Sequence, residues 1–437
     1  MSTPPFTSFA AELEAAFRPD ELDEIGRVVG FTKRRRVITS ARLVTALVWV
    51  LGALRVESIA DLLRGFNQTT GTATAYKAFW CRLARPEFVA LMKAVVQRCL
   101  DRLAVKTLEF DEDSPFRRFK DIRIQDGSSF AVKQSLSGAF PGRFTTVEPA
   151  AVEVHGEFSA IHDEVVRVSL TADSASERAE LPEPHTLKDC LLLGDRGYPG
   201  TDYFKALDAA GGFYIMRLTK SWKPQVHGEY APDGEVRPLN KPMSLDQFAA
   251  RNLGRVLDLS ISLAKDGHKS RFRLVMVPNT STNPKKKDDW IRLCTNLPAA
   301  DFPSELVARA YRFRWQIELV FKEWKSYANL HKFDSGNASI VEGLIWASLC
   351  AAIVKRFVAH AAQNELALPV STRRTAMLMP YFLEELMCGI LQRDDLGLGR
   401  AWRKTIAFIA ANGLRSNPKR DREKGRLRMG LREVAMA

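Results

Sequence analysis

The sequence of 437 residues lacks several features that would assign it at once to a known chemistry. Its six cysteines are scattered, and neither a CxxC pair nor a Cys/His cluster indicates zinc. No glycine-rich phosphate loop of the Walker type is present, so we expect no nucleotide cofactor. Its apolar runs are shorter than the roughly 20 residues that cross a bilayer. Structural zinc, ATP-driven chemistry and membrane insertion are therefore poor starting interpretations.

The sequence near the N-terminus also lacks the basic and apolar regions of a secretory signal. It is acidic instead, with Glu12, Glu14, Asp20, Glu21 and Asp23. Isolated thiols are typical of a reducing cytoplasm. We therefore expect a soluble, cytoplasmic protein.

Positive charge and apolar residues are what the chain has in excess. The net charge of +13 favours a polyanionic partner. Hydrophobic residues make up 46% of the sequence, which is enough for a substantial core. The length predicts two or three domains rather than one small one.

Patterns along the chain divide it into five expected regions. They are a helical domain expected to bind DNA (1–110), the first part of an α/β core (111–218), a β-rich insertion (219–300), the last part of that core with the longest helix (301–360) and a helical C-terminal region with a basic tail (361–437). The C-terminal helices are candidates for a subunit contact.

The first region reads as short helices separated by polar turns. Ser58 and Asp61 have the spacing of a helix N-cap and its third residue, and a Thr- and Gly-rich turn covers 69–74. Short helices with a turn and a basic cluster are consistent with a helix-turn-helix-like unit. The cluster consists of Lys33, Arg34, Arg35 and Arg36. A plain helical bundle with a solvated cluster is the alternative.

The second region predicts a mixed five-stranded sheet with helices. Period-two alternation or unbroken apolar runs indicate strands at 122–125, 151–158, 165–170, 190–194 and 213–218. Short helices are expected at 174–181 and 203–210, which gives an α/β fold class. Within 219–300, further short strands surround prolines and glycines.

The longest uninterrupted helical pattern covers 306–330, where neither proline nor glycine occurs. At about 100° per residue, its apolar residues form one arc and four polar side chains share an adjacent arc. These four are Tyr311, Arg314, Glu318 and Lys325. The spacing of Arg314 and Glu318 permits an ion pair, so a charged surface helix is the simplest interpretation.

Three carboxylates stand out by their positions in these patterns. Asp126 is expected at the end of the first strand, Asp195 at the end of the fourth, and Glu318 on the long helix. If those strands are neighbours, the side chains converge into a site for Mg²⁺ shared with substrate phosphates. Two such ions promote in-line displacement at phosphorus. Aspartates at strand ends often only form turns, which is the alternative for each alone.

The helix also matches a known pattern, in which Tyr, two residues, Arg, three residues, Glu, six residues and Lys follow one another. In this spacing the chain resembles the DDE transposases of the insertion-sequence-4 group, the YREK type of bacterial cut-and-paste enzymes. The segments Asp126-Gly-Ser and Asp195-Arg-Gly-Tyr are similar to the first and second aspartate motifs of that family. The resemblance extends from about residue 10 to about residue 400.

The resemblance implies a ribonuclease-H-like catalytic core with a β insertion between Asp195 and Glu318, which are 123 positions apart. It implies that Asp126, Asp195 and Glu318 are catalytic and ligate two Mg²⁺ or Mn²⁺ ions. It further implies that phosphates near the cut end are held by Tyr311, Arg314 and Lys325.

Weaker DNA contacts are expected at three other positions. Trp290 lies 21 positions before Tyr311, where a relative places a tryptophan that stacks on a flipped base. Packing inside the insertion is its alternative. Lys322 on the long helix and Arg217 at the end of the fifth strand are candidates for backbone contacts.

The sequence is thus expected to encode a transposase that binds its element's ends, cleaves them and joins the 3′-hydroxyls to target DNA. As implied by the resemblance, it would act as a homodimer on double-stranded DNA in a bacterial cytoplasm, without a membrane partner. Two alternatives are an endonuclease of the same fold without strand transfer and a DNA-binding regulator that no longer cuts.

Overall fold

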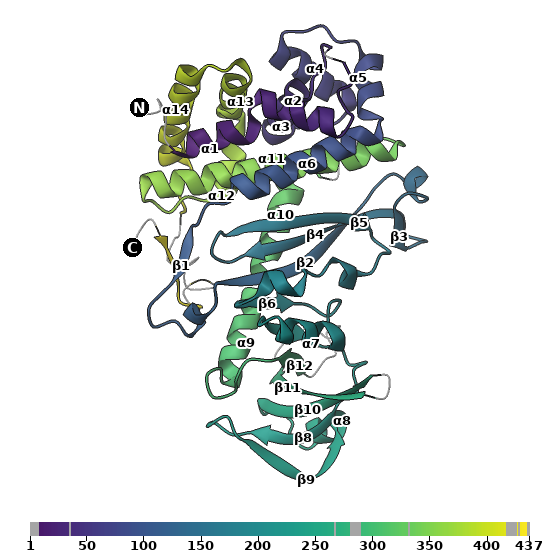
Figure 1. Cartoon of the computed structure of the whole chain (residues 1–437), viewed down its shortest axis with the longest axis vertical. Coiled ribbons are helices and arrows are strands. Elements are labelled where there is room, and N and C mark those ends of the chain that lie inside the picture. Colours follow the sequence, from purple (N-terminus) through teal and green to yellow (C-terminus); the bar gives the residue numbers. More distant parts are fainter. Residues whose placement is uncertain are drawn as a thin grey trace.

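The computed structural model describes residues 8–34, 36–265, 268–279, 290–330, 333–416, 426 and 429–434. Figure 1 shows helices from both ends of the chain gathered at one end of the molecule, while a long sheet extends away from them. Arg35, one of the four residues of the predicted basic cluster, lies outside the described residues.

The chain begins with six helices: α1 (Ser8–Phe17), α2 (Pro19–Val28), α3 (Ser40–Ala53), α4 (Ile59–Thr70), α5 (Tyr76–Leu83) and α6 (Pro86–Arg102). The predicted cap of α4 is present as a capping box. The Asp61 N–H donates to the Ser58 hydroxyl, and the Ser58 N–H donates to the Asp61 carboxylate. A short polar turn then joins α4 to α5, but the turn predicted over 69–74 begins too early, because Thr69 and Thr70 are the last residues of α4.

The C-terminal part of the chain adds the helices α11 (Ala338–Leu366), α12 (Thr372–Leu378), α13 (Leu383–Gln392) and α14 (Asp395–Asn412). By length and composition α11 could cross a membrane, but 83% of its most apolar window is buried inside the protein. It packs against α3, α6 and α12. Burial among other helices therefore accounts for its apolar sequence.

Five strands form the central part of the sheet: β2 (Asp121–Ala131), β4 (Glu148–Ser159), β5 (Glu164–Ala172), β6 (Cys190–Gly194) and β7 (Phe213–Arg217). Their order is β5-β4-β2-β6-β7. β4 is antiparallel to both β5 and β2, whereas β2, β6 and β7 are parallel. The predicted mixed α/β sheet is confirmed.

Between these strands lie α7 (Thr201–Ala209), as predicted, and a 3₁₀ turn at Glu177–Glu180. The helix expected over 174–181 was wrong, because only this turn forms there. Leu181 is followed by Pro182 and Pro184, which cannot donate the backbone hydrogen bonds that would extend a helix.

The region predicted as a β insertion continues the same sheet. Its strands are β8 (Gln225–Tyr230), β9 (Val236–Ser244), β10 (Leu257–Lys265), β11 (His268–Pro278) and β12 (Trp290–Thr295), with helix α8 (Leu245–Ala250) between β9 and β10. β12 pairs antiparallel with β7, and the order from there is β12-β11-β10-β8-β9. The sheet thus runs without interruption from the core into this region, and β3 (Pro141–Phe144) pairs with β4 at its opposite edge.

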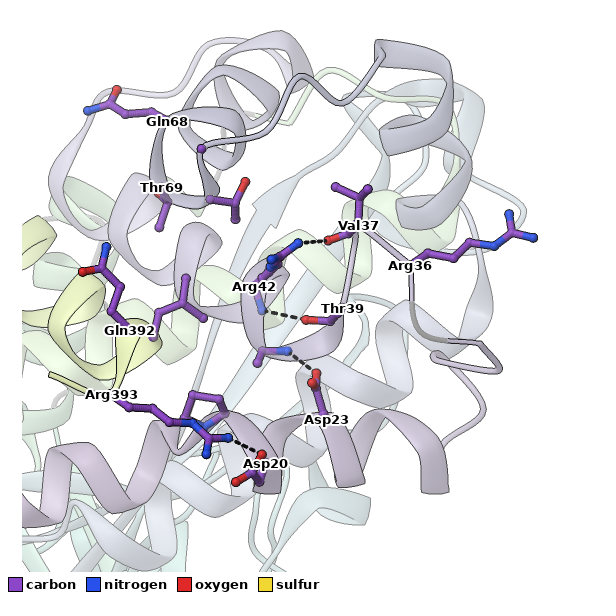
Figure 2. Close-up of a pocket in the computed structure, with 15 residues that line it drawn as sticks. Asp20, Asp23, Arg36, Val37, Thr39, Arg42, Gln68, Thr69, Gln392 and Arg393 are labelled. Carbon is purple, nitrogen blue, oxygen red and sulfur yellow. Dashed lines mark hydrogen bonds and ion pairs between the residues drawn. The ribbon is translucent and has the colours of Figure 1, made fainter.

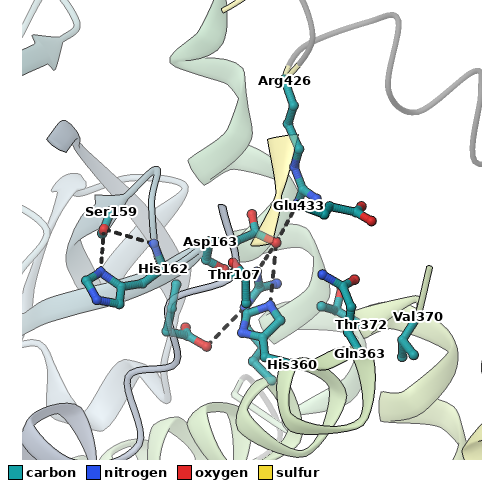
Figure 3. A network of polar contacts seen from close by, with 12 residues as sticks. Thr107, Ser159, His162, Asp163, His360, Gln363, Val370, Thr372, Arg426 and Glu433 are labelled. Carbon is teal, nitrogen blue, oxygen red and sulfur yellow. Dashed lines mark hydrogen bonds and ion pairs between the residues drawn. The ribbon is translucent and has the colours of Figure 1, made fainter. Parts of the chain in front are cut away.

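A buried charge network joins the C-terminal part of the chain to the sheet (Figure 3). Arg426 and Arg356 both bind Asp163 in the turn between β4 and β5, and His360 Nε2 lies 3.5 Å from an Asp163 oxygen. Arg356 Nε lies 3.2 Å from Glu164. Burial lowers the pKa of His360 to about 4, so the imidazole is neutral at pH 7. Nearby, β13 (Leu431–Glu433) pairs with β1 (Leu108–Phe110).

Candidate active site

Two of the three predicted carboxylates follow neighbouring parallel strands at the same edge of the sheet. The last paired residues of β2 and β6 are Gln125 and Gly194, and the next residues are Asp126 and Asp195. The expectation that the first strand ends at Asp126 was wrong, because β2 continues to Ala131 by pairing with β4 alone. Asp126 therefore lies where the parallel pairing stops, and this places it beside Asp195.

The long helix predicted over 306–330 is divided into α9 (Ser304–Phe313) and α10 (Trp315–Tyr327). The interruption lies at Arg314, whose N–H donates to the Tyr311 carbonyl three residues earlier, at 3.1 Å. This hydrogen bond spans three residues, whereas those of an α-helix span four. The helical register therefore changes between Tyr311 and Arg314.

Apolar residues hold α10 against the sheet next to Asp126. Ile317, Phe321 and Trp324 are buried, and the first two contact Gly156 of β4. A Cβ at Gly156 would lie 3.3 Å from the Phe321 ring, which is tighter than ordinary contact. Gly156 pairs directly with Asp126, so its lack of a side chain lets the helix approach the sheet at the position of the site.

Arg314 joins the first and third carboxylates. Its Nη1 donates to Asp126 Oδ2, and its Nη2 donates to Glu318 Oε1 at 2.7 Å. The Arg314 and Asp126 side chains are 12% and 17% exposed, so water screens their attraction only in part. The ion pair that the helical spacing permits is present, and the same guanidinium also reaches the sheet.

Asp195 is held by two residues from other elements. The Tyr311 hydroxyl donates to Asp195 Oδ1 at 3.0 Å, and Arg217 Nη1 lies 3.8 Å from the same oxygen. Burial raises the pKa of Tyr311 above its ordinary range, and the Asp195 charge raises it further, so the phenol is a neutral donor. In this structure Tyr311 and Arg217, both predicted to contact DNA, orient the second carboxylate.

The electrostatic environment of Asp126 is distinctive. Its pKa rises from 3.8 to about 6, chiefly because the carboxyl is buried. Arg314 and the Gly127 N–H oppose this rise, whereas the charges of Asp195 and Glu318 add to it. The charges of Asp195 and Glu318 act on Asp126 because the three carboxylates lie close together, and a shared cation would neutralise them.

The two lysines of α10 lie in different settings. Lys325 Nζ donates to the Ser129 carbonyl of β2 at 2.8 Å, and burial lowers its pKa. Lys322 is exposed, and its ammonium lies 4.6 Å from the centre of the Trp315 ring. Lys325 thus contacts the strand that carries Asp126, while Lys322 faces solvent.

The described residues contain no group of three or more His, Cys, Asp or Glu side chains already arranged around a metal position. Between Asp126 and Glu318 the guanidinium of Arg314 provides the positive charge instead. A pair of carboxylates that binds a guanidinium in this way is also suited to bind a metal cation in its place. Oxygen donors without soft ligands fit Mg²⁺ or Mn²⁺.

Trp290 is packed in the core of the β-rich region. It is 7% exposed and belongs to the apolar cluster that includes Leu274 and Met276 of β11. In this structure Trp290 therefore packs inside the β-rich region, as the alternative to base stacking predicts. Stacking on a base would require the indole to leave that cluster.

The described residues of the predicted basic cluster lie in the loop before α3, where Arg36 lines a cavity of about 690 Å³ (Figure 2). Lys33, Arg34 and Arg36 are exposed. In Figure 2 the Arg36 side chain extends away from Asp20 and Asp23, which are engaged by Arg393 and by the backbone at the start of α3.

Two further arginines lie close to this loop. Burial lowers the pKa of Arg82 on α5, and the positive charges of Arg85 and Arg36 lower it further. The Glu87 charge opposes this lowering. Arg36, Arg82 and Arg85 thus lie close enough to interact and form a group of positive charges. These arginines extend from the basic loop to α5 of the predicted helix-turn-helix-like unit.

Sequence reasoning missed a group of charged side chains near Asp126. Arg143 contacts Glu153 at 3.3 Å and Glu177 at 3.0 Å. The pKa of Glu153 rises to about 7, mainly through burial, and the Asp126 charge contributes. These residues come from separate segments: the pairing of β4 with β2 and β3 brings Asp126, Arg143 and Glu153 together, and Glu177 reaches them from the 3₁₀ turn after β5.

Comparisons with known proteins agree with this geometry. The family described as "Transposase DDE domain" matches residues 117–354, a span that contains all three carboxylates. The transposase of insertion sequence IS231E from Bacillus thuringiensis subsp. finitimus is 24% identical over 373 residues, which cover 78% of each chain. The IS231D transposase of the same organism is 21% identical and aligns with 94% of this chain and 92% of its own.

Two other matches are more limited. A putative transposase of element IS186A from Escherichia coli strain K12 is 39% identical over 64 residues, which are 15% of this chain and 17% of its own. Among solved structures, the piggyBac transposase synaptic complex with hairpin DNA aligns with 96% of this chain and 89% of its own. That alignment has a TM-score of 0.46 and 9% identity.

The candidate site thus contains three carboxylates and cationic side chains at the edge of a mixed sheet. Since the family match covers more than half of its residues, the chain belongs to the DDE transposases. The resemblance seen in the YREK spacing is thereby confirmed at the level of this family.

Proposed function

We propose that this chain is a cut-and-paste transposase that cleaves the ends of its own element and joins them to target DNA. The observation that carries the proposal is the bridge from Arg314 to both Asp126 and Glu318, next to Asp195 on the adjacent strand. The bridge joins two of the three carboxylates of the motif, and the third follows β6, the strand parallel to β2. Family membership supports the same chemistry.

In this proposal Asp126, Asp195 and Glu318 hold two Mg²⁺ or Mn²⁺ ions. When bound, the ions supply an activated attacking oxygen and stabilise the leaving oxygen of an in-line displacement. Tyr311 keeps Asp195 oriented through its hydroxyl. Arg314 turns from the carboxylates toward a DNA phosphate, where its planar fork suits two phosphate oxygens.

The remaining cations extend this DNA contact. Lys325 and Lys322 of α10, with Arg217 of β7, would neutralise phosphates close to the cut. The positive surface of Lys33, Arg34, Arg36 and α5 would bind the element end farther away. The strand order β5-β4-β2-β6-β7 supports a ribonuclease-H-like core for this arrangement. Two copies of the chain, one for each end, would form the synaptic complex.

A product assay tests the proposal. The purified protein is incubated in Mg²⁺ with labelled duplexes that carry the inverted repeats flanking its coding sequence, together with a target plasmid. We expect cleaved ends and ends joined to the plasmid. Asp126→Ala and Glu318→Gln should abolish both products while DNA binding persists, and Glu305→Gln, at an exposed carboxylate of α9, should react normally.

The same assay separates the alternatives. Cleaved but unjoined ends would identify an endonuclease of the same fold. Binding without cleavage would identify a DNA-binding regulator. Cleavage by Asp126→Ala at the wild-type rate would refute the assignment of the site.

A further inference from the structure

The sheet face opposite α10 carries an arginine that binds two carboxylates at once. Arg143 of β3 donates through Nη2 to Glu153 Oε2 at 3.3 Å and to Glu177 Oε1 at 3.0 Å. Its backbone N–H also donates to Asp173 Oδ2 at 2.8 Å, which fixes β3 against the residue that follows β5. We call Arg143, Glu153 and Glu177 the rear clamp.

The pairing of β2 with β4 shows that the rear clamp and α10 lie on opposite faces of the sheet. Asp126 pairs with Gly156, which α10 contacts, so both residues face that helix. Successive residues of a strand point to opposite faces. Gly127 is one position after Asp126 and therefore faces away from α10. Glu153 is three positions before Gly156 and faces away as well.

Each carboxylate of the rear clamp lies against a glycine of an aspartate motif. A Cβ at Gly127, the residue after the first motif aspartate, would lie 2.4 Å from Glu153 Oε1. A Cβ at Gly197, two residues after the second motif aspartate, would lie 1.7 Å from Glu177 Oε2. Both distances are too short for a real Cβ, so the glycines let the carboxylates approach the backbone this closely. The rear clamp thus contacts the chain beside two of the three candidate metal ligands.

We propose that Arg143 is a positioning residue, which sets the spacing of Asp126 and Asp195 by holding the rear clamp against the two motif glycines. The parallel pairing of β2 with β6 ends at Gln125 and Gly194, immediately before these aspartates. Their spacing therefore depends on contacts outside that ladder, and a bridge between the segments that follow them supplies one. This inference rests on the proposed function, because it assumes that both aspartates hold metal ions.

Burial distinguishes the rear clamp from an ordinary surface ion pair. Glu153 is 4% exposed, so its charge needs the guanidinium beside it. The side chain of Arg143 is 45% exposed and lies on a strand at the edge of the sheet. Replacing Arg143 should therefore leave the fold intact while it releases the buried carboxylate.

The test measures metal selectivity, because Mg²⁺ and Mn²⁺ carry the same charge. Loss of the Arg143 charge changes both affinities alike. A changed ligand spacing penalises Mg²⁺ more, since Mg²⁺ demands near-ideal octahedral geometry. The full chain without DNA is titrated with Mn²⁺, and the free ion is quantified by electron paramagnetic resonance. Mg²⁺ affinity is then measured by the displacement of bound Mn²⁺.

For Arg143→Gln we expect the ratio of Mg²⁺ affinity to Mn²⁺ affinity to fall roughly tenfold, the lower end of what residues that orient metal ligands contribute. Glu153→Gln should lower the ratio in the same way. The double variant should lower it no further, because both substitutions open the same bridge. Arg143→Lys should recover part of the ratio, since an ammonium can also donate to two carboxylates.

Arg167→Gln is the matched control. Arg167 of β5 binds Glu157, another buried glutamate of β4, at 3.3 Å. Glu157 lies opposite Gln125, before the motif glycine of β2. This variant loses a comparable ion pair and should keep the wild-type ratio.

The inference is overturned if Arg143→Gln changes both affinities by the same factor, because only its charge would then act. It is also overturned if Arg167→Gln lowers the ratio as much as Arg143→Gln does. Cleavage of element ends by the wild type, with an unchanged ratio in Arg143→Gln, would refute this inference and leave the proposed function standing. A lowered ratio in a chain that cuts no element end would do the reverse.

Discussion

Replacing Arg314 with glutamine should tighten the binding of Mn²⁺ to the DNA-free protein even though it slows DNA cleavage. Arg314 binds both Asp126 and Glu318, so a divalent cation must displace this guanidinium before it can use those carboxylates. The variant removes the competing positive charge. It also removes the group that we expect to bind the phosphate, which is why affinity for metal and cleavage should change in opposite directions.

The size of the effect follows from the contacts. Two unit charges about 4 Å apart attract by about 4 kcal/mol at an effective dielectric constant of about 20. Glu318 keeps 28% of its side chain exposed, so solvent reduces the attraction on that side. Once released, Arg314 also regains hydration. We therefore expect a net competition of about 1–2 kcal/mol, or roughly a tenfold change in the Kd for Mn²⁺.

The assay is calorimetric titration of Mn²⁺ at about pH 8 without DNA, since Asp126 with a pKa of about 6 is then ionised. Arg312→Gln is the matched control, because Arg312 is exposed on the same helical segment. Equal or weaker Mn²⁺ binding by Arg314→Gln than by Arg312→Gln would refute the idea that the guanidinium and the metal compete.

Two further predictions follow from single contacts. Tyr311→Phe removes the hydroxyl that donates to Asp195 at 3.0 Å, so we expect cleavage to fall about tenfold with little change in Tm; an unchanged rate would exclude this orienting role. Burial raises the pKa of Glu164 from 4.5 to about 8, so the folded protein keeps a proton that the unfolded chain loses. Stability should therefore fall as pH rises between those values, and Glu164→Gln should abolish that component of the slope in urea unfolding. Identical slopes for variant and wild type would contradict it.

Local patterns predicted the elements whose signals are short-range. Alternation or apolar runs indicated the five core strands, and the Ser58–Asp61 spacing predicted the N-cap of α4, which is present as a capping box. The YREK spacing identified the helix that carries Glu318, because helical periodicity alone brings Arg314 and Glu318 together.

Features that depend on long-range pairing were missed. Nothing near Asp126 in the sequence indicates that β2 continues past it, because that continuation depends on pairing with β4, whose sequence is more than twenty positions away. Likewise, the β-rich region joins the core sheet through the pairing of β12 with β7. The five domain boundaries drawn from composition stay a prediction.

The tryptophans show the same limit for the candidate site. Trp290 and Trp315 both lie near the motif in sequence, but only the packed structure distinguishes the buried ring from the exposed one. Burial depends on which strands and helices cover a residue.

The central claim is that Asp126 and Glu318 ligate, together with Asp195, the metal ions that support DNA cleavage. The most direct measurement is cleavage of an element end by Asp126→Cys and Glu318→Cys in Mg²⁺ and in Mn²⁺, because a thiolate is a poorer ligand for Mg²⁺ than for Mn²⁺. We predict that both variants lose cleavage in Mg²⁺ and recover part of it in Mn²⁺. Cleavage at the wild-type rate in Mg²⁺ by either variant would contradict the claim.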